Sequence, residues 1–267
     1  MPQAAVESRH LGLKTADEIA DLQEKIALLA DALVLDWQRL AVLTEKPAPE
    51  ALPGAAAPTS VRIAVAKDEA FCFTYAETLD ALRDAGAELV LFSPVQDAVL
   101  PENIGGLYLP GGYPELYAKT LSENKTMLAS IRQAVQAGLP TAAECGGFLY
   151  LGRSLEDADG KVCPWQMFCR AMASGWEAGA LWLCRNDRQG GQYALLRRRN
   201  AAIHEFHHWD STANGTAFTA CKNEKMQWEC GFANENFYAG FPHLYWAGTP
   251  LPGRFVRAAE RYSKTKG

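Results

Sequence analysis

The sequence predicts an α/β protein in which helices flank a parallel sheet, preceded by a helical segment at the N-terminus. Between residues 61 and 145, short runs of apolar and β-branched residues alternate with stretches of helical periodicity. Strands separated by helices form βαβ units, whose strands are parallel. A proline- and alanine-rich stretch divides this region from the N-terminal segment.

The N-terminal segment carries an apolar stripe with helical spacing. Over residues 15–35 the apolar side chains alternate in steps of three and four, behind Thr15 and Glu18, which match a capping box. The stripe consists of Ile19, Leu22, Ile26, Leu29 and Leu33. We expect an amphipathic helix over residues 15–35, followed by a shorter apolar piece over residues 37–43. The stripe must be covered, either by folding back on the larger domain or by a second copy of the chain. Because its spacing resembles a coiled-coil seam, we favour a homodimer through residues 15–35.

Residues 45–60 read EKPAPEALPGAAAPTS, which contains four prolines and many alanines. Such a composition does not form a packed element, so it predicts a linker. The expected domains are therefore a helical segment over residues 1–44 and a larger domain over residues 61–267.

The larger domain is expected to contain six elements before residue 146. In order they are strand VRIAVA at 61–66, a helix at 75–85, strand ELVLF at 88–92, strand GGLYLP at 105–110, a helix at 125–137 and strand PTAAEC at 140–145. After about residue 160 the pattern becomes less regular, with GALWLC at 179–184 and QYALL at 192–196 as expected strands.

Composition excludes several classes of protein. The formal net charge of −5 offers no basic surface for nucleic acid. No apolar run approaches the roughly 20 residues that span a bilayer, and the N-terminus lacks the apolar middle of a signal peptide, so we expect a cytoplasmic protein. The seven cysteines include no C-x-x-C pair, which argues against a disulfide framework or a zinc site.

The stretch PTAAECGGFLYLG places Cys145 where the fourth expected strand meets a helix. This is the carboxyl edge, where open α/β sheets bind ligands. Ala143, Gly146 and Gly147 provide the small neighbours that a nucleophile elbow requires. The following helix should lower the pKa of the thiol and supply N–H donors for an oxyanion. A buried structural thiol and a redox site are the alternatives, and the glycines favour the nucleophile.

A second glycine pair, Gly111 and Gly112 in LYLPGGYPE, ends the preceding strand. In a parallel sheet this pair would lie beside the elbow, where its backbone N–H groups complete an oxyanion hole. An ordinary strand-ending turn explains Pro-Gly-Gly equally well.

A cysteine nucleophile needs a general base, and histidine is suited to this because its pKa lies near neutrality. Of the five histidines, three cluster in IHEFHHWD and one, His243, stands in AGFPHLYWAG. The cluster includes His204 and His208, four residues apart, but no obvious third ligand follows them. We therefore expect no metal site.

Several runs resemble one enzyme family. They are VAKDEAFCFTYAETLDALRDAGAELVLFSPVQD, LPENIGGLYLPGGYPELYAKTLSEN, GLPTAAECGGFLYLG, HEFHHWD and GFPHLYW. Together they resemble the glutamine amidotransferase half of cobyrinate a,c-diamide synthases, which amidate two carboxylates of a corrin ring in cobalamin biosynthesis. The resemblance implies a flavodoxin-like or Rossmann-like sheet of the class I glutamine amidotransferase type over residues 61–267. Residues 9–43 look like the end of the family's ATP-dependent synthetase domain, which makes residues 1–44 a remnant of it.

The resemblance also implies catalytic roles. Cys145 would attack the glutamine side-chain amide, and His243 would activate it and protonate the departing ammonia. Gly111, Gly112 and Gly146 would bind glutamine and the thioester oxyanion. Well-known amidotransferases of this class place a glutamate two residues after the histidine, but that position here is Tyr245, and the cobyrinate family itself commonly has histidine there. A Cys-His dyad is therefore implied, with another group orienting His243.

Two further motifs are implied to line the path of substrate or ammonia. Asp68, Glu69 and Phe71 match the family's Asp-Glu-Ala-Phe segment, although a solvated loop explains the acidic pair as well. Glu205 and His207 belong to the motif HEFHHWD.

The sequence contains no P-loop, since GLKT at residues 12–15 matches only a fragment of one. We expect the chain to bind no cofactor, with ATP and Mg²⁺ held only by a missing domain or a partner. Its partners would be glutamine and, through an ATP-binding domain in trans, a corrinoid acceptor. The chain would then be truncated, a split subunit or a gene fragment. Two other functions remain open: an inactive amidotransferase-like binding module, and a cysteine hydrolase acting on another amide.

Overall fold

The computed structural model describes residues 2–7, 14, 16–45, 61–164, 169–175, 180–185, 201–223 and 225–266. The chain divides into two compact units, Met1–Ala55 and Ala56–Gly267. Of the expected linker, residues 46–60 lie outside the described residues.

The smaller unit contains two short helices. Its elements are η1 (Pro2–Ala4), η3 (Ala16–Glu18), α1 (Leu22–Asp31) and α2 (Trp37–Thr44). The expectation of one helix over residues 15–35 is therefore wrong, because Glu18 lies in a separate 3₁₀ turn and Leu33 lies beyond α1. None of the residues of α1 is buried. Since most helical stability comes from packing, an unpacked α1 lacks what would extend it.

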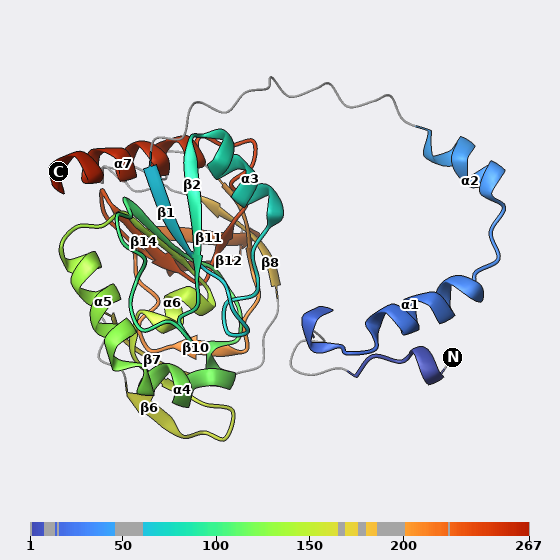
Figure 1. Ribbon diagram of the computed structural model, residues 1–267, viewed down its shortest axis with the longest axis horizontal. Helices are drawn as coiled ribbons and strands as arrows, with labels where there is room; N and C mark the ends of the chain where they lie inside the picture. Colours follow the sequence, from blue (N-terminus) through green and yellow to red (C-terminus); the bar gives the residue numbers. More distant parts are fainter. Residues whose placement is uncertain are drawn as a thin grey trace. The chain divides into compact units, whose positions relative to one another are not determined.

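The larger unit is built around a six-stranded sheet (Figure 1). Its order is β13 (Phe232–Ala233), β14 (Phe237–Gly240), β4 (Thr141–Glu144), β3 (Gly106–Leu109), β1 (Val61–Ala66) and β2 (Ala87–Phe92). All neighbours are parallel except β13, which is antiparallel to β14. The predicted α/β fold with a parallel sheet is confirmed, and its first four strands are the predicted ones.

Helices cover both faces of this sheet (Figure 1). They are α3 (Ala76–Asp84), η4 (Pro114–Tyr117), α4 (Ala118–Glu123), α5 (Lys125–Gln136), α6 (Gly146–Tyr150) and α7 (Leu251–Lys266). Successive residues of a strand point to opposite faces. In β1, Ala64 belongs to the apolar cluster that contains Ile131 of α5, whereas Ile63 belongs to the cluster that contains Phe255 of α7. Both faces of the sheet are thus covered, which explains why its central strands β1 and β3 are predominantly apolar.

Two smaller sheets, largely antiparallel, follow the elbow region in the sequence. One has the order β10 (Trp209–Ser211), β7 (Cys169–Gly175), β5 (Gly152–Glu156) and β6 (Val162–Pro164). The other has the order β12 (Met226–Cys230), β11 (Phe218–Asn223), β8 (Ala180–Arg185), β9 (Ala201–Glu205) and β15 (His243–Leu244). The expected strand GALWLC corresponds to β8, and QYALL lies outside the described residues. The pairing of β15 with β9 places His243 opposite His204, so the two histidine motifs meet.

No helix in the described part of the chain is both long and apolar enough to cross a membrane.

Candidate active site

Cys145 occupies a strained turn at the carboxyl edge of the parallel sheet. It follows β4 directly and is the N-cap residue of α6, with φ 49° and ψ −104°. Among the described non-glycine residues only Asn103 also has a positive φ. Such a conformation costs about 1–3 kcal/mol and persists where the surroundings hold it. Here the backbone N–H of Cys145 donates to the carbonyl of Gly240, at 2.8 Å, in the neighbouring strand. This is the geometry of a nucleophile elbow.

The two glycines after Cys145 are needed because α6 begins against the end of β3. A Cβ on Gly147 would overlap the carbonyl oxygen of Leu109, and one on Gly146 would lie 2.9 Å from the backbone nitrogen of Gly112. The helix therefore begins beside the second glycine pair. The structure brings Gly112 and Gly146 together, as the sequence predicted.

Gly111 and His243 are also in contact. A Cβ on Gly111 would overlap Cε1 of the His243 imidazole, so only glycine leaves room for the ring. The ring is 3% exposed and packs edge-on against Phe73, with ring centroids 5.0 Å apart. Phe73 in turn donates its backbone N–H to the carbonyl of Gly111, at 3.0 Å. His243 is thus held beside the glycine pair that borders the elbow.

The thiol of Cys145 is not acidified. Burial raises its pKa well above the usual range, and the carboxylate of Glu115 raises it further. The backbone N–H of Gly146 lowers the pKa, as the sequence analysis expected, but α6 spans only five residues and burial outweighs its effect. The expectation of a lowered thiol pKa is therefore wrong.

The imidazole of His243 is held in its neutral form. Burial, together with the smaller effects of nearby His204 and His207, lowers its pKa to about 3. A neutral imidazole is the form that can accept a proton from a thiol. In the resting protein, Cys145 is therefore a thiol and His243 a neutral imidazole.

Glu144 is a buried acidic residue that the sequence analysis did not include among the site residues. Its Oε2 accepts from the hydroxyl of Tyr108 at 2.9 Å. Its Oε1 accepts from the backbone N–H of Leu244 at 3.2 Å and from Nε1 of Trp246 at 3.0 Å. Oε2 also lies 3.9 Å from Nδ1 of His243. The only signal in the sequence was an acidic residue ending an otherwise small and apolar strand, directly before the cysteine.

Tyr245, two residues after the histidine, turns away from the buried core. Its side chain is 47% exposed, and its ring packs edge-on against Tyr75 with centroids 5.6 Å apart. This position is therefore occupied by an exposed aromatic residue.

The motif HEFHHWD lies against the cysteine. The carbonyl oxygen of Phe206 is 3.8 Å from Sγ of Cys145. Oε1 of Glu205 lies 3.1 Å from Nε2 of His207, whose ring stacks on Phe241 with centroids 3.8 Å apart. Oε2 of Glu205 is buried and has no hydrogen-bond partner among the residues that the structure describes. Within the described residues, no group of three or more His, Cys, Asp or Glu side chains is placed to hold a metal.

The segment after β1 is mainly structural. Asp68 accepts four hydrogen bonds of 2.8 to 3.0 Å, two from its own loop and two from Ser93 and Val95. Phe71 is fully buried. These two side chains stabilise the loop, and of the three predicted residues only Glu69 is exposed to a ligand in solution.

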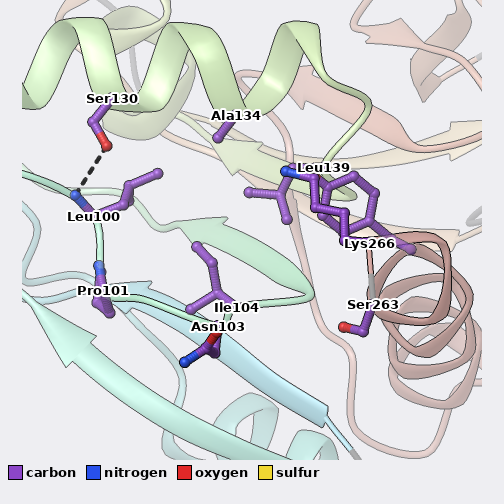
Figure 2. A pocket seen from close by; sticks show the side chains of 10 residues that line it. Leu100, Pro101, Asn103, Ile104, Ser130, Ala134, Leu139, Ser263 and Lys266 are labelled. Atoms are coloured by element: carbon purple, nitrogen blue, oxygen red, sulfur yellow. Dashed lines mark hydrogen bonds between the residues drawn. The ribbon is translucent and has the colours of Figure 1, made fainter.

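A pocket of about 540 Å³ lies elsewhere in the larger unit (Figure 2). It is lined by the segment that precedes β3, by α5 and by the end of α7, and Figure 2 shows Leu100 donating to Ser130 at 3.1 Å along its wall. These residues adjoin the amino ends of β3 and β4, whereas Cys145 lies at the carboxyl end of β4. None of the predicted site residues lines this pocket.

The larger unit is thus an α/β domain that places a cysteine on a strand-to-helix elbow, beside a glycine pair that packs against a neutral buried histidine. The family model for the CobB/CobQ-like glutamine amidotransferase domain matches residues 62–250. The chain therefore belongs to this family and carries a glutamine amidotransferase domain.

The similarity to curated relatives extends over more of the chain than residues 62–250. A cobyrinate a,c-diamide synthase of Caldanaerobacter subterraneus subsp. tengcongensis is 36% identical over 251 residues, which cover 88% of this chain and 54% of the relative. A hydrogenobyrinate a,c-diamide synthase of Pseudomonas aeruginosa is 38% identical over 95% of this chain and 57% of its own length. The chain thus spans about half the length of these relatives. Among solved structures, a glutamine amidotransferase from Thermotoga maritima aligns with 78% of this chain and 85% of its own, with 14% identity and a TM-score of 0.48.

Proposed function

We propose that this chain hydrolyses glutamine and supplies the ammonia for ATP-dependent amidation of corrinoid carboxylates, at the a and c positions of cobyrinate, in cobalamin biosynthesis. The observation that carries the proposal is Cys145 on its strained elbow, packed among the glycines that adjoin the neutral imidazole of His243. The names of the curated relatives support the choice of a corrinoid acceptor.

In the proposed reaction, the thiol of Cys145 gives its proton to His243 as Sγ attacks the side-chain amide carbon of glutamine. The tetrahedral oxyanion accepts hydrogen bonds from the backbone N–H groups of Gly112 and Gly146. Collapse of the intermediate breaks the C–N bond, and His243 returns the proton to the departing ammonia. Water then hydrolyses the thioester, releasing glutamate and restoring the thiol.

The amidation half of the reaction needs an activated carboxylate, and we assign that step to an ATP-binding domain acting in trans. ATP and Mg²⁺ would bind there, and this chain would hold no cofactor of its own. The homodimer through residues 15–35 remains a prediction, now based on the exposed side chains of Ile26 and Leu29, at 49% and 52%.

The chain alone should release ammonia from glutamine but form no diamide when ATP and cobyrinate are added. Free ammonia is protonated in open water before it can attack, and the carboxylates stay unactivated. Glutamate release and mass spectrometry of the corrinoid, with glutamine labelled with ¹⁵N in its amide, measure the two outcomes.

Addition of an ATP-dependent domain from one of the relatives should transfer the label into the corrinoid. No glutamate release under any condition would instead favour an inactive binding module. Diamide formation by the chain alone would show that it contains an ATP site.

Glu205 is the proposed anchor for the α-ammonium group of glutamine. Within the described part of the chain, its Oε2 is buried without a hydrogen-bond partner, and an unpaired buried carboxylate oxygen is costly unless a ligand satisfies it. Two observations support this role: the neighbouring carbonyl of Phe206 contacts Sγ of Cys145, and the charge of Glu205 contributes to raising the pKa of the Cys145 thiol.

Replacing Glu205 with glutamine should raise KM for glutamine roughly 10- to 100-fold, the effect of losing a hydrogen bond to a charged group, with a smaller change in kcat. Glutaramate, which lacks the α-ammonium group, provides the matched comparison. Wild-type protein should prefer glutamine over glutaramate, and Glu205→Gln should lose most of that preference. An unchanged preference in the variant would remove Glu205 from substrate recognition.

A further inference from the structure

We propose that Glu144 positions the imidazole of His243 for proton transfer from Cys145. It would thereby take the role for which related amidotransferases use an acidic residue two positions after the histidine. This inference rests on the proposed function, in which His243 is the general base. Glu144 would act through His243 and would not itself touch the substrate.

The imidazole ring of His243 lies with Nδ1 towards the Glu144 carboxylate. Oε2 of Glu144 lies 3.9 Å from Nδ1 of His243, with side chains 1% and 3% exposed respectively. Because Nδ1 is directed to the carboxylate, Nε2 is the nitrogen left for the thiol of Cys145. The separation exceeds a hydrogen bond in the resting state, and it should shorten when His243 becomes positively charged in this water-poor site.

The carboxylate of Glu144 is held in place by three hydrogen-bond donors. Its donors are Tyr108 of β3, the backbone of Leu244 in β15, and the indole of Trp246. Two of these donors lie one and three residues after His243. Glu144 therefore holds the chain that carries the histidine and lies beside its ring, so little reorganisation is needed when charge develops.

The ionised form of Glu144 is the one that can stabilise a positively charged His243. Burial raises the pKa of Glu144 to about 7, although its three donors oppose this. At neutral pH a large fraction is thus already carboxylate, and an imidazolium at Nδ1 would stabilise that form further. Glu144 and the imidazole can therefore support each other when the thiol loses its proton.

The remaining candidate for this role is the position that the related enzymes use. Here that residue is Tyr245, which is 47% exposed and contacts Tyr75. Its side chain carries no carboxylate and does not lie in the buried layer that contains Glu144. The geometry therefore favours the residue before the cysteine over the residue after the histidine.

Alkylation of Cys145 by iodoacetamide tests the inference without using glutamine. The thiol gives its proton to His243, the sulfur forms a bond to the methylene carbon, and iodide leaves. Peptide mass spectrometry gives the rate at Cys145. Glu144→Gln should slow alkylation about 10-fold or more at pH 7, towards the rate of His243→Asn, because the glutamine amide offers no charge to the imidazolium.

A double variant separates positioning from a merely structural role. If Glu144 acts through His243, then Glu144→Gln should cost nothing further once His243→Asn is present. A structural role predicts the same loss in both backgrounds. Two control variants should leave the alkylation rate of Cys145 at the wild-type value. They are Glu88→Gln, which changes an exposed residue of β2, and Tyr245→Ala.

The inference fails if Cys145 in the Glu144→Gln variant is alkylated at the wild-type rate. It also fails if Glu144→Gln slows alkylation equally when His243→Asn is already present. Should Glu144→Gln not fold, as judged by its circular dichroism, Glu144→Asp retains the charge at a greater distance from Nδ1. That variant should react at a rate between those of His243→Asn and wild type, and a wild-type rate would overturn the inference. Failure of the proposed function would appear separately, as wild-type protein that releases no glutamate.

Discussion

Replacing Cys145 with serine should lower kcat for glutamine hydrolysis by about 10⁴-fold or more, the scale of loss when a nucleophile is removed. A serine hydroxyl fits the elbow, but it is far less acidic than a thiol and His243 is a weak base in its buried position. Circular dichroism should show an unchanged fold, and the loss should appear in glutamate release. Cys163→Ser, at a buried cysteine distant in sequence from the elbow, is the matched control and should remain active.

A diazo-ketone analogue of glutamine should label Cys145 alone among the seven cysteines. Because burial raises the pKa of the Cys145 thiol, this thiol is not unusually reactive by itself. The selectivity has to come from binding of the glutamine analogue next to it. A general alkylating reagent should instead react faster with the half-buried Cys72 and Cys221. Analogue labelling spread over several cysteines would contradict the assignment of the nucleophile.

Replacing His243 with asparagine should lower kcat by about 10³- to 10⁴-fold while the fold is retained. An asparagine amide fits the space beside Gly111 but cannot accept the thiol proton. Because the imidazole is neutral in the resting protein, its loss removes a base that is ready to act. Glutamate release under saturating glutamine measures the effect.

His208→Asn is the matched control for this prediction. It changes a histidine in the motif HEFHHWD, and the variant should retain near-wild-type activity. The opposite pattern, in which His243→Asn is active and His207→Asn is inactive, would mean that the base belongs to that motif.

The first four strands of the parallel sheet and the helices between them at α3 and α5 were predictable because their signals are local. The apolar runs of β1 and β3 and the helical periods of α3 and α5 each lie within a few residues, and their alternation indicates parallel strands. The N-terminal helix was predicted too long for the same reason. Its periodicity is genuine, but a helix in which no residue is buried lacks the packing that would extend it.

The smaller sheets after residue 150 were mostly missed. Their strands pair across long stretches of sequence, as β15 does with β9, and they lack the strict alternation that marks a half-buried strand. Their importance for the site is that they bring the motif HEFHHWD and His243 to the same edge as Cys145.

The sequence by itself determined which residues have the chemistry of the site: a cysteine between an acidic residue and two glycines, a second glycine pair, and late histidines. The glycines after the cysteine are a local pattern that a tight strand-to-helix turn requires. The tertiary structure alone decided the protonation states, because the pKa values of Cys145 and His243 depend on burial by residues far away in the chain. It alone also showed Asp68 to be a loop anchor and placed Glu144 against His243, since a contact across about a hundred residues of sequence exists only after the parallel sheet has brought the ends of its strands together.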